Sequence, residues 1–502
     1  MKGRGGLCLC LAEETIEADL RVAAAYATHV DLLELRADFL AAGEAALAGR
    51  LPRLVEVPVI LTLRRARDGG RFAGSESERL SLLGRLAQGG FAYVDLEEDL
   101  DANGVEKLAA AAGARIIRSF HDFTGVPRDL AGRVEKMARS RGEIPKAAVT
   151  PTSAADLALI IEAFGRLKGR EKILLGMGDI GFPIRVLSPR LGSMVCYSSA
   201  PGSSAAPGHT DPRTLDGLYR VRAISARTAV FGIVGNPVMH SLSPLIHNRG
   251  FTEIGMDAVY VPFTVDRLEP FWSAAKSLQV QGLSVTIPHK QAVVPLLSER
   301  DDIVDSVGAC NTMVRAGQGG EGWRGTNTDV EGFLSPLREA FGGRVPAGLG
   351  ATVIGAGGAS RAVVHALSAN SAHVLVLNRT VARAREIAAG FDAEAGGLDE
   401  EGCRRAAGFS DLVVQATSAG MGDRPGEDPL PGYRFTGSEI VYELVYTPAE
   451  TPFLRRAIEA GCRIISGRRM LIAQACAQFR LFTGHAYPPG LRQELETSSE
   501  AF

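Results

Sequence analysis

The chain has 502 residues, a length that exceeds one ordinary hydrophobic core and predicts two or three domains. It contains 46% hydrophobic and 22% charged residues, the composition of a soluble globular protein, and its formal net charge is −2. That balance excludes the strongly basic surface by which proteins bind nucleic acid or anionic membranes. We therefore expect small-molecule partners, with no nucleic acid and no membrane, and the oligomeric state stays open.

The seven cysteines are scattered, with no CxxC motif and no Cys/His pair at zinc spacing. They are interpreted as small buried thiols in a reducing compartment, and no metal site is expected. No apolar run approaches the about 20 residues that a membrane helix needs. The first segment continues into Glu13 and Glu14 without a small-residue cleavage site, so we expect a first strand and a cytoplasmic protein.

Short apolar runs alternate with helical patterns up to about residue 220. The runs cover residues 7–12, 30–38, 58–64, 93–98, 114–123, 144–151, 172–178 and 192–199. Between them lie stretches such as TSAADLALIIEAFGRLKG, with apolar residues at three- and four-residue spacing, as in amphipathic helices. Eight strands that alternate with helices predict an α/β fold with a (β/α)8 barrel, to which we assign residues 1–222. An open doubly wound sheet is the alternative.

Polar residues recur at the C-terminal ends of these runs. They are Glu34, Arg36, Arg64, Glu97, His121 and Lys146. In a (β/α)8 barrel the C-terminal ends of the strands carry the active site. A surface position at the start of a loop would explain any one of these residues, but it does not explain the repetition.

A segment rich in turn residues and a short basic connector precede a second α/β segment that begins near residue 228. We predict a substrate-binding domain over residues 228–338 together with 466–502. A Rossmann-type dinucleotide-binding domain is predicted over residues 339–465. No internal repeat is present, which indicates a fusion of different domains and not a duplication.

A glycine-rich turn lies between a predicted strand and a predicted helix in ATVIGAGGASRAVV. The glycines of residues 355–358 permit a tight turn, so that a pyrophosphate can lie at the N-terminus of the helix. The next strand ends in NRT, where Arg379, with Arg383 one turn later, suits a 2′-phosphate. The motif therefore predicts NADP(H) as the cofactor.

Reduction of a carbonyl by hydride transfer needs a proton donor for the developing alkoxide. Lys290 follows a strand-like run and Asp329 lies in a turn, so the pair could hold an ammonium group beside a ketone. Taken alone, a surface lysine and a turn aspartate are the simpler interpretation. Short polar side chains, which suit a polyhydroxylated substrate, gather in the same region. They are Ser241, Ser243, Asn311, Thr312, Asn327 and Thr328.

Lys146 lies in an apolar strand pattern, IPKAAVTP, where its side chain should point into the barrel. There desolvation can remove its charge, and the free amine can attack a ketone to form an imine. A base is then needed for the hydrogen on the adjacent carbon, and His121 in the preceding strand is the candidate. Lys146 alone would be interpreted as structural or solvated, and its pairing with His121 favours catalysis.

Residues 228–490 resemble the shikimate dehydrogenase family. The shared motifs are GNPVMHSLSPLIHN, VTIPHK, GACNT, GTNTD, GAGGASRA, NRT, ATSAGM and VYTPAETPFLRRAIEAGCRIISGRRMLIAQA. The resemblance implies NADPH-linked reduction of 3-dehydroshikimate, with Lys290 and Asp329 as the catalytic pair. The substrate contacts it implies are Ser241, Ser243, Thr286, Asn311, Asn327, Tyr446 and Gln474. The cofactor contacts we expect are Gly355, Ala356, Gly357, Gly358, Ala359, Asn378, Arg379, Thr380, Arg383, Thr417 and Gly467.

Residues 1–218 resemble type I 3-dehydroquinate dehydratase. The matching segments are DLLELRAD, LTLRRARDGGRF, DLEE, SFHDF, IPKAAVTP, MGDIGFPIR and APGH. The resemblance implies that Lys146 forms a Schiff base with the substrate, while His121 takes the α-proton and then helps water leave. Arg185 would hold the substrate carboxylate in a bidentate manner. The pocket positions it implies are Glu34, Arg36 and Arg64, and Asp68 and His209 are also expected to bind the substrate.

Five positions depart from the usual patterns of the two families. In the barrel, Asp68 replaces a glutamate that would contact His121, and His209 replaces a glutamine. In the second half, Ser284 and Gln415 stand where asparagine is common, and Glu443 stands where aspartate is usual. Activity is expected in both halves despite these changes.

Together the resemblances predict a bifunctional enzyme of the shikimate pathway, in aromatic amino acid biosynthesis, whose first product is its second substrate. A Schiff-base aldolase is an alternative for the barrel, which the HDF and APG segments and the inner arginines disfavour. Reduction of quinate-type substrates is an alternative for the second half. From another class of protein, one half could be a non-catalytic sensor, although both predicted catalytic pairs are present.

Overall fold

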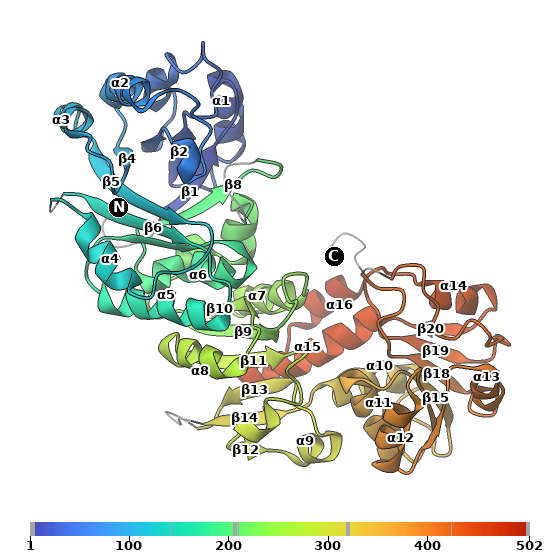
Figure 1. The fold of residues 1–502 in the computed structure, drawn as a ribbon. Helices are drawn as coiled ribbons and strands as arrows, with labels where there is room; N and C mark the ends of the chain where they lie inside the picture. The colour runs from blue at the N-terminus through green and yellow to red at the C-terminus, as the bar shows by residue number, and fades with distance from the viewer. Residues whose placement is uncertain are drawn as a thin grey trace. The chain divides into compact units, whose positions relative to one another are not determined.

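The computed structural model describes residues 6–140, 142–203, 208, 210–317, 322–422 and 424–497 (Figure 1). The chain divides into two compact units, Met1–Val280 and Gln281–Phe502. Both units combine helices with sheets in which most neighbouring strands are parallel, so the predicted α/β class is confirmed. The three predicted domain boundaries stay predictions.

The first unit begins with eight parallel strands. They are β1 (Gly6–Leu11), β2 (Leu32–Arg36), β3 (Val59–Thr62), β4 (Tyr93–Glu97), β5 (Arg115–Asp122), β6 (Ile144–Val149), β7 (Ile173–Gly176) and β8 (Val195–Ser199). Their order is β7-β6-β5-β4-β3-β2-β1-β8. A backbone hydrogen bond of 2.8 Å from Met194 N to Lys172 O joins the segments that lead into β8 and β7. The strands therefore form the predicted barrel, nearly closed, and not an open sheet.

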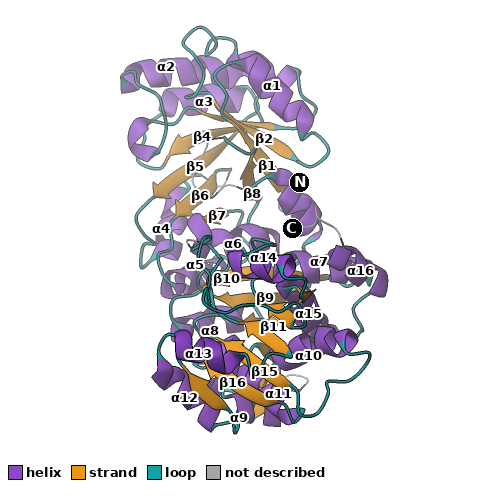
Figure 2. Ribbon diagram, turned by 90° about the vertical axis from the view of Figure 1, so that its right-hand side faces the viewer, coloured by secondary structure: helices purple, strands orange, loops and turns teal. Residues whose placement is uncertain are grey.

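Helices connect most of these strands and lie outside them, as Figure 2 shows for α1, α2 and α3. They are α1 (Ile16–Ala25), α2 (Glu76–Leu86), α3 (Asn103–Ala111), α4 (Leu130–Met137), α5 (Ala154–Arg166) and α6 (Gly178–Leu191). Capping residues begin several of them: Ser75 and Glu78 form a capping box at α2, and Ser153 accepts from the amide of Asp156 at α5. Between β2 and β3 the chain forms only a 3-10 helix, η1 (Ala48–Arg53).

The barrel interior is apolar near the beginning of the strands and polar further along them. Leu32, Ile117 and Ile144 belong to one buried core cluster inside the barrel. Because side chains two positions apart point to the same face of a strand, the next inward residues of β2, β5 and β6 are Glu34, Ser119 and Lys146. The apolar layer therefore supports a polar layer above it.

The first unit continues beyond the barrel into β9 (Ala229–Gly235), α7 (Ser243–Glu253), β10 (Ala258–Thr264) and α8 (Leu268–Ser277). Strands β9 and β10 are parallel. Helix α5 packs along α8, and Asp266 Oδ1 accepts a hydrogen bond of 2.9 Å from Ala154 N at the start of α5. This segment is thus attached to the barrel by packing as well as by the connector.

The second unit opens with four strands of a mixed sheet. Its strands are β11 (Val280–Val285), β12 (Glu299–Arg300), β13 (Thr312–Arg315) and β14 (Trp323–Thr326). Strand β13 pairs antiparallel with β11 and with β14, whereas β12 pairs parallel with β14. The helices that follow β12 and β14 are α9 (Asp302–Val307) and α10 (Asp329–Ala340).

A parallel sheet of six strands follows. The strands are β15 (Gly350–Ile354), β16 (His373–Leu377), β17 (Glu394–Gly396), β18 (Leu412–Gln415), β19 (Ile440–Glu443) and β20 (Arg463–Ile465). The helices are α11 (Gly358–Ala369), α12 (Val381–Ala389), α13 (Glu400–Ala406), α14 (Pro452–Glu459), α15 (Gly467–Thr483) and α16 (Pro489–Thr497). The order β17-β16-β15-β18-β19-β20 reverses direction beside β15, which is the Rossmann arrangement. The predicted Rossmann-type fold is confirmed.

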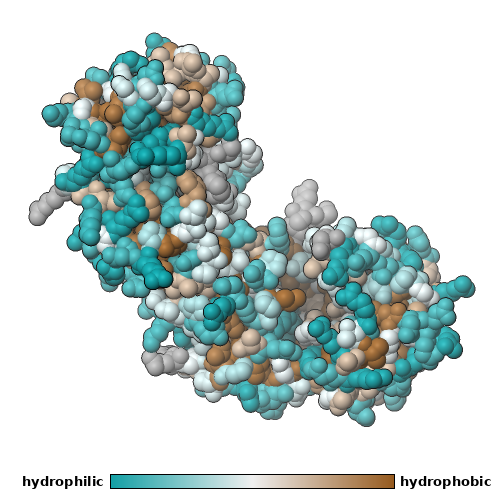
Figure 3. Space-filling view, viewed as in Figure 1, coloured by the Kyte–Doolittle hydropathy of each residue, from teal (hydrophilic) through white to brown (hydrophobic). Residues whose placement is uncertain are grey.

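Two surface properties bear on partners. No helix in the described part of the chain is long and apolar enough to cross a membrane. On the face drawn in Figure 3, apolar residues are scattered among hydrophilic ones.

Helix α6 approaches strand β7 closely at Gly181, and a substitution there can test this packing. A Cβ atom on Gly181 would lie 2.3 Å from the backbone carbon of Gly176, so α6 would have to move away from β7. We expect Gly181→Ala to lower the free energy of unfolding by about 1–3 kcal/mol, measured by urea denaturation.

Gly165→Ala is the matched control. It lies on the exposed side of α5, where no atom stands within 4 Å of an added Cβ, and it should raise the free energy of unfolding by up to about 1 kcal/mol. Equal effects of the two substitutions would contradict the close approach of β7 and α6.

Candidate active sites

Lys146 of β6 lies inside the barrel with 3% of its surface exposed. Its Nζ donates hydrogen bonds to Asp95 Oδ2 at 3.0 Å and to Glu34 Oε1 at 3.3 Å. The same Nζ lies 4.3 Å from the centre of the Tyr197 ring. The lysine is therefore enclosed by two carboxylates and an aromatic face, and it points inward as the sequence predicts.

The expectation that burial leaves Lys146 uncharged is wrong. Burial by itself lowers the pKa of Lys146, but the negative charges of Asp95 and Glu34 outweigh it, and the pKa lies above its usual value. The lysine is thus an ammonium ion in the resting site. A proton must leave Nζ before it can attack a carbonyl carbon.

His121 can receive such a proton. Ser119 of β5 pairs with Lys146 of β6, and His121 pairs with Ala148, so His121 and Lys146 point to the same face one pleat apart. Burial, together with the positive charges of Arg64 and Lys146, holds the pKa of His121 well below its usual value. Its Nδ1 is buried and has no hydrogen-bond partner among the described residues. The imidazole is neutral near pH 7 and available as a base.

Arg64 joins the acids of this layer. Its guanidinium lies 3.0 Å from Asp95 Oδ1 and 3.3 Å from Glu97 Oε1, and it donates to Ser119 Oγ at 2.8 Å. Burial alone would raise the pKa of Asp95, but the charges of Arg64 and Lys146 hold it below its usual value. Asp95 is therefore ionised and binds both cations.

The predicted pocket residues Glu34 and Arg36 also have partners in the barrel. Glu34 accepts hydrogen bonds from Thr62 Oγ1 at 2.9 Å and from Cys10 Sγ at 3.2 Å. Arg36 forms a bidentate pair with Asp38, at 3.0 and 2.8 Å. The structure thus brings Glu34, Arg64, His121 and Lys146 together, with Arg36 held by Asp38.

The remaining three predicted residues of this site differ in placement. Arg185 of α6 is buried and donates to Tyr197 O at 2.5 Å, and its Nε has no partner within the described residues. Asp68 pairs with Arg65 and lies 3.8 Å from Arg67, and no hydrogen bond to His121 is present in the described structure. His209 lies outside the described residues.

Sequence reasoning did not select Asp95, Ser119 or Tyr197. Asp95 precedes Glu97 by two residues on β4, so the strand period placed it on the inward face, and that signal could have found it. Tyr197 lies within an apolar run on β8 that carries no polar pattern. Only its contact with Lys146 shows its position.

The second candidate site is built around Lys290 and Asp329. Lys290 Nζ lies 2.5 Å from Asp329 Oδ2, at the first residue of α10. Asn311 Nδ2 donates to the other carboxylate oxygen at 2.7 Å, and Asn327 Oδ1 accepts from Asp329 N at 3.1 Å. The predicted pair is thus formed. The amide of Asn311 holds its carboxylate, and Asn327 holds the backbone of Asp329.

A glutamine absent from the prediction connects this site to α15. Gln478 accepts from Ser284 Oγ at 2.8 Å and donates to Thr312 Oγ1 at 3.0 Å. Gln474 also lies on α15, where its amide donates to Leu471 O at 2.9 Å and its backbone packs against Gly332 of α10.

The other predicted substrate contacts lie in loops and at a helix start. Thr286 follows β11 and is half-buried, and Tyr446 lies in the loop after β19, where burial raises its pKa. Ser241 and Ser243 belong to the first unit, where Ser241 Oγ accepts from Ser243 N at 3.2 Å at the start of α7.

The glycine turn leads from β15 into α11 as predicted. Gly355 has φ +118°, and an added Cβ would lie 3.0 Å from the backbone of Ala416, so this position requires glycine. Ser360 Oγ accepts from Gly357 N at 3.2 Å and supports the helix start. Gly358 packs beside Lys290, with 3.7 Å between its added Cβ and Lys290 Cδ. The turn, with Ala356 and Ala359, therefore borders the Lys290 site.

The end of β16 carries exposed cationic side chains. Asn378 Nδ2 donates to Thr380 O at 2.9 Å and shapes the turn, while Arg379 and Arg383 are exposed. Neither guanidinium has a hydrogen bond or ion pair within the described residues. Among the described residues nothing occupies either guanidinium, so both can bind an anion. Thr417 lies in the turn after β18, and Gly467 is the first residue of α15.

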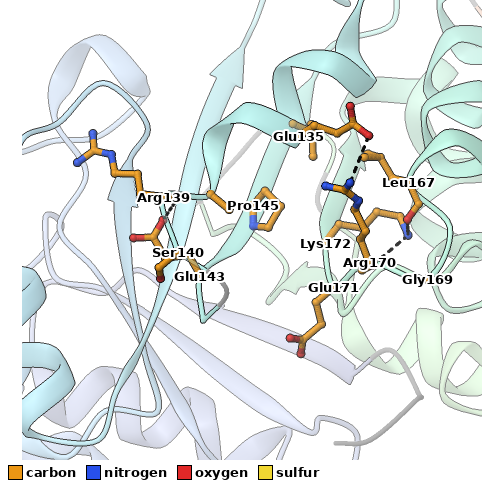
Figure 4. A pocket seen from close by; sticks show the side chains of 12 residues that line it. Glu135, Arg139, Ser140, Glu143, Pro145, Leu167, Gly169, Arg170, Glu171 and Lys172 are labelled. Atoms are coloured by element: carbon orange, nitrogen blue, oxygen red, sulfur yellow. Dashed lines mark hydrogen bonds and ion pairs between the residues drawn. The ribbon is translucent and has the colours of Figure 1, made fainter.

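A cavity of about 650 Å³ lies elsewhere, at the N-terminal ends of β6 and β7 (Figure 4). Its charges are paired within the protein. Lys172 Nζ donates to Leu167 O at 3.1 Å and to Gly192 O at 3.4 Å, and Arg170 lies 3.9 Å from Glu135. Since active sites of barrels lie at the C-terminal ends of the strands, this cavity is separate from the predicted chemistry.

Family sequence models match three parts of the chain. Type I 3-dehydroquinase matches residues 7–226, the shikimate dehydrogenase substrate binding domain matches 233–313, and shikimate/quinate 5-dehydrogenase matches 346–421. The fold and the family matches thus define a lyase with a barrel fold that is fused to a Rossmann-type oxidoreductase.

Known proteins extend this result to the full length. A bifunctional 3-dehydroquinate dehydratase/shikimate dehydrogenase of Arabidopsis thaliana, named as chloroplastic, is 31% identical over 96% of this chain and 82% of its own length. A shikimate dehydrogenase (NADP(+)) of Moorella thermoacetica is 43% identical over 53% of this chain and 91% of its own. The crystal structure of shikimate dehydrogenase from Aquifex aeolicus has a TM-score of 0.50 and 31% identity, covering 55% of this chain and 100% of that one.

The chain belongs to the family of bifunctional 3-dehydroquinate dehydratase/shikimate dehydrogenases. The predicted combination of a dehydratase with a dehydrogenase of the shikimate pathway is confirmed. The comparisons support this main prediction and not its alternatives, a quinate-specific reductase or a non-catalytic sensor.

Asp95, which binds both Lys146 and Arg64, can be tested by Asp95→Asn. We expect the dehydratase kcat to fall about 10- to 100-fold, because a hydrogen bond to a charged group is worth about 1.5–3 kcal/mol and each 1.4 kcal/mol is about tenfold. Turnover of 3-dehydroquinate by the purified variant measures this, and its dehydrogenase activity is the control. A dehydratase kcat equal to that of the wild type would contradict the role of Asp95.

Proposed function

We propose that Lys146 is the Schiff-base lysine that dehydrates 3-dehydroquinate to 3-dehydroshikimate. The observation that carries this proposal is the enclosed Nζ of Lys146, between Asp95 and Glu34 inside the barrel, with a neutral His121 on the adjacent strand. A buried cationic amine beside a neutral base has the two groups that imine formation requires.

The proton transfers follow from the charges of these groups. His121 accepts a proton from the Lys146 ammonium, and the free amine adds to the substrate ketone. His121 then returns this proton to the departing hydroxyl, which leaves as water and gives a protonated imine, so that His121 is neutral again. His121 then removes the proton from the adjacent carbon, and the electron pair moves toward the imine nitrogen. Return of the proton to the leaving hydroxyl releases a second water, and hydrolysis of the imine frees Lys146.

Arginines bind the substrate in this proposal. Arg185 has an unpartnered, buried Nε, and burial lowers the pKa of its guanidinium, so an arriving carboxylate would supply the missing acceptor. Arg36 and Arg64 are held in place by acids and orient toward the substrate hydroxyls, together with Glu34. We further propose that Asp68 and His209 are substrate-binding residues.

We propose that Lys290 and Asp329 form the catalytic pair of the dehydrogenase. When bound, NADPH supplies the hydride for the carbonyl of 3-dehydroshikimate. Lys290 donates a proton to the alkoxide oxygen, and Asp329 holds its ammonium in position through the 2.5 Å contact. Asn311 orients this carboxylate, and Asn327 holds the backbone of Asp329. The substrate hydroxyls and carboxylate are bound by Asn311 and Asn327 together with Ser241, Ser243, Thr286, Tyr446 and Gln474.

The residues around the glycine turn fit NADP(H). Gly355 allows the tight turn, and no atom stands within 4 Å of an added Cβ at Gly357, so a pyrophosphate can lie at the N-terminus of α11. Arg379 and Arg383 have no hydrogen bond or ion pair among the described residues and offer two guanidinium groups for a 2′-phosphate. The other residues of the proposed cofactor site are Ala356, Gly357, Ala359, Asn378, Thr380, Thr417 and Gly467.

The seven cysteines are free, which supports a reducing, cytoplasmic compartment.

Reciprocal substitutions separate the two activities. With 3-dehydroquinate and NADPH as the only additions, the wild-type chain should oxidise NADPH. The Lys146→Met variant should not oxidise NADPH with 3-dehydroquinate but should do so when 3-dehydroshikimate is supplied. The Lys290→Met variant should not oxidise NADPH with either substrate but should still convert 3-dehydroquinate to 3-dehydroshikimate.

A second experiment locates the lysine that forms the Schiff base. Borohydride added with 3-dehydroquinate should attach the substrate to Lys146, detected by peptide mass. Attachment at another lysine would refute the assignment.

Cofactor choice is tested at the end of β16. Arg379→Ala should raise the KM for NADPH about 10- to 100-fold, because a charged hydrogen bond is worth about 1.5–3 kcal/mol, and should leave the KM for NADH nearly unchanged. Arg385→Ala is the matched control, since Arg385 is exposed on the next turn of α12. Equal losses with NADPH and NADH would show that Arg379 does not bind the 2′-phosphate.

A further inference from the structure

Two of the five departures from the family patterns are paired in space. Gln415 and Glu443 are the last residues of β18 and β19, and they stand directly opposite each other in the parallel ladder. Both are buried, with 0% and 1% of their surface exposed. Each is one methylene longer than the residue usual at its position, so the two lengthened side chains share one edge of the sheet.

Gln415 shapes the loop of residues 416–421, which carries Thr417. Its Oε1 accepts from Thr417 N at 2.5 Å and its Nε2 donates to Ala419 O at 3.0 Å. Both ends of the amide are thus used by the loop. We call residues 416–421 the cofactor loop.

Glu443 shapes the loop of residues 444–451, which carries Tyr446 and is called here the substrate loop. One carboxylate oxygen accepts from Val445 N at 3.0 Å at the start of the loop, and the other accepts from Thr451 Oγ1 at 2.7 Å at its end. Thr451 Oγ1 also accepts from Leu454 N at 3.1 Å and so begins α14. A single carboxylate therefore closes the loop at both ends.

The two loops touch. Gly420 of the cofactor loop has φ +86°, and an added Cβ would lie 2.8 Å from Thr451 Cβ. On the other side, Gly467 at the start of α15 packs against the substrate loop, with 2.5 Å between its added Cβ and Leu444 O. A shift of either loop must therefore move the other, because no space separates them.

We propose that Gln415 and Glu443 are a matched pair of positioning residues that set the affinity of the dehydrogenase for its substrate and cofactor by holding the two loops in register. The inference rests on the proposed function, since it takes Thr417 as a cofactor contact and Tyr446 as a substrate contact. Neither Gln415 nor Glu443 need touch a ligand for this role.

The charge of Glu443 adds a dependence on pH. Burial raises the pKa of Glu443 to about 7, although the hydrogen bonds from Val445 and Thr451 act in the opposite direction. The charged group that faces it is Asp428, which is paired with Arg456 of α14 at 2.7 Å. Above pH 7 the carboxylate accepts both hydrogen bonds, and below pH 7 its protonated oxygen loses one acceptor position.

The pairing is tested by a double-mutant cycle on the full-length enzyme, with shikimate and NADP+ as substrates. Glu443→Asp should raise the KM for shikimate about tenfold, and Gln415→Asn should raise the KM for NADP+ by a similar factor, with smaller changes in kcat. The double variant, which restores both usual residues, should show increases at least threefold smaller than those of the single variants. Increases in the double variant that equal those of the single variants would overturn the pairing.

The pH profile separates a positioning role from a merely structural one. For the wild type, the KM for shikimate should rise about tenfold from pH 8 to pH 6. Glu443→Gln should show the high KM at both pH values. Glu443→Asp should keep an inflection in the plot of KM against pH, because it still carries a titratable carboxyl group. Parallel profiles for the wild type and Glu443→Gln would overturn the role of Glu443. A wild-type chain without any shikimate oxidation would instead refute the proposed function itself.

Discussion

The buried positive charge of Lys146 is the constraint on which the barrel site depends. An ammonium group inside a barrel is tolerated only if acids compensate it, and Asp95 and Glu34 do so. Asp95 in turn binds Arg64, Arg64 binds Glu97, and Glu97 binds Arg79 of α2 at 3.0 Å. Charges of alternating sign therefore extend from the centre of the barrel to its helical wall, and none of these groups is buried alone.

This network explains why the same layer holds a positively charged lysine and a neutral histidine, Lys146 and His121. The acids that stabilise the Lys146 ammonium raise its pKa, whereas burial and the neighbouring cations lower that of His121. In the resting site the proton therefore stays on Lys146. It can pass to His121 only when a bound substrate changes the pKa values of the two groups. The dehydrogenase pair has a more open setting: the side chain of Lys290 is 17% exposed, against 4% for Lys146. In the proposed reactions, Lys290 donates a proton in each turnover and can recover it from solvent, whereas Lys146 forms its imine in a site with little exposure to solvent.

Much of the fold could be predicted because its signals are local. Eight apolar runs gave eight strands, and the glycine turn before SRAVV gave the tight β15–α11 connection, since strand period and backbone freedom depend on neighbouring residues. Between β2 and β3 the chain forms only the 3-10 helix η1, although the alternation of strands and helices predicts an α-helix there. In the site, Lys146 and His121 were found because they interrupt apolar strands, whereas Tyr197 was missed because a tyrosine in an apolar run looks like an ordinary core residue.

The sequence by itself determined the alternation of strands and helices, the inward direction of Lys146 and the family to which both halves belong, because motifs and periodicity are written along the chain. Only the tertiary structure decided the charge of Lys146, its contact with the Tyr197 ring and the pairing of Gln415 with Glu443. Each of these depends on which side chains meet across strands that lie far apart in the sequence. Electrostatic effects act through space over a few ångströms, so their sign follows from that arrangement and not from the order of the residues.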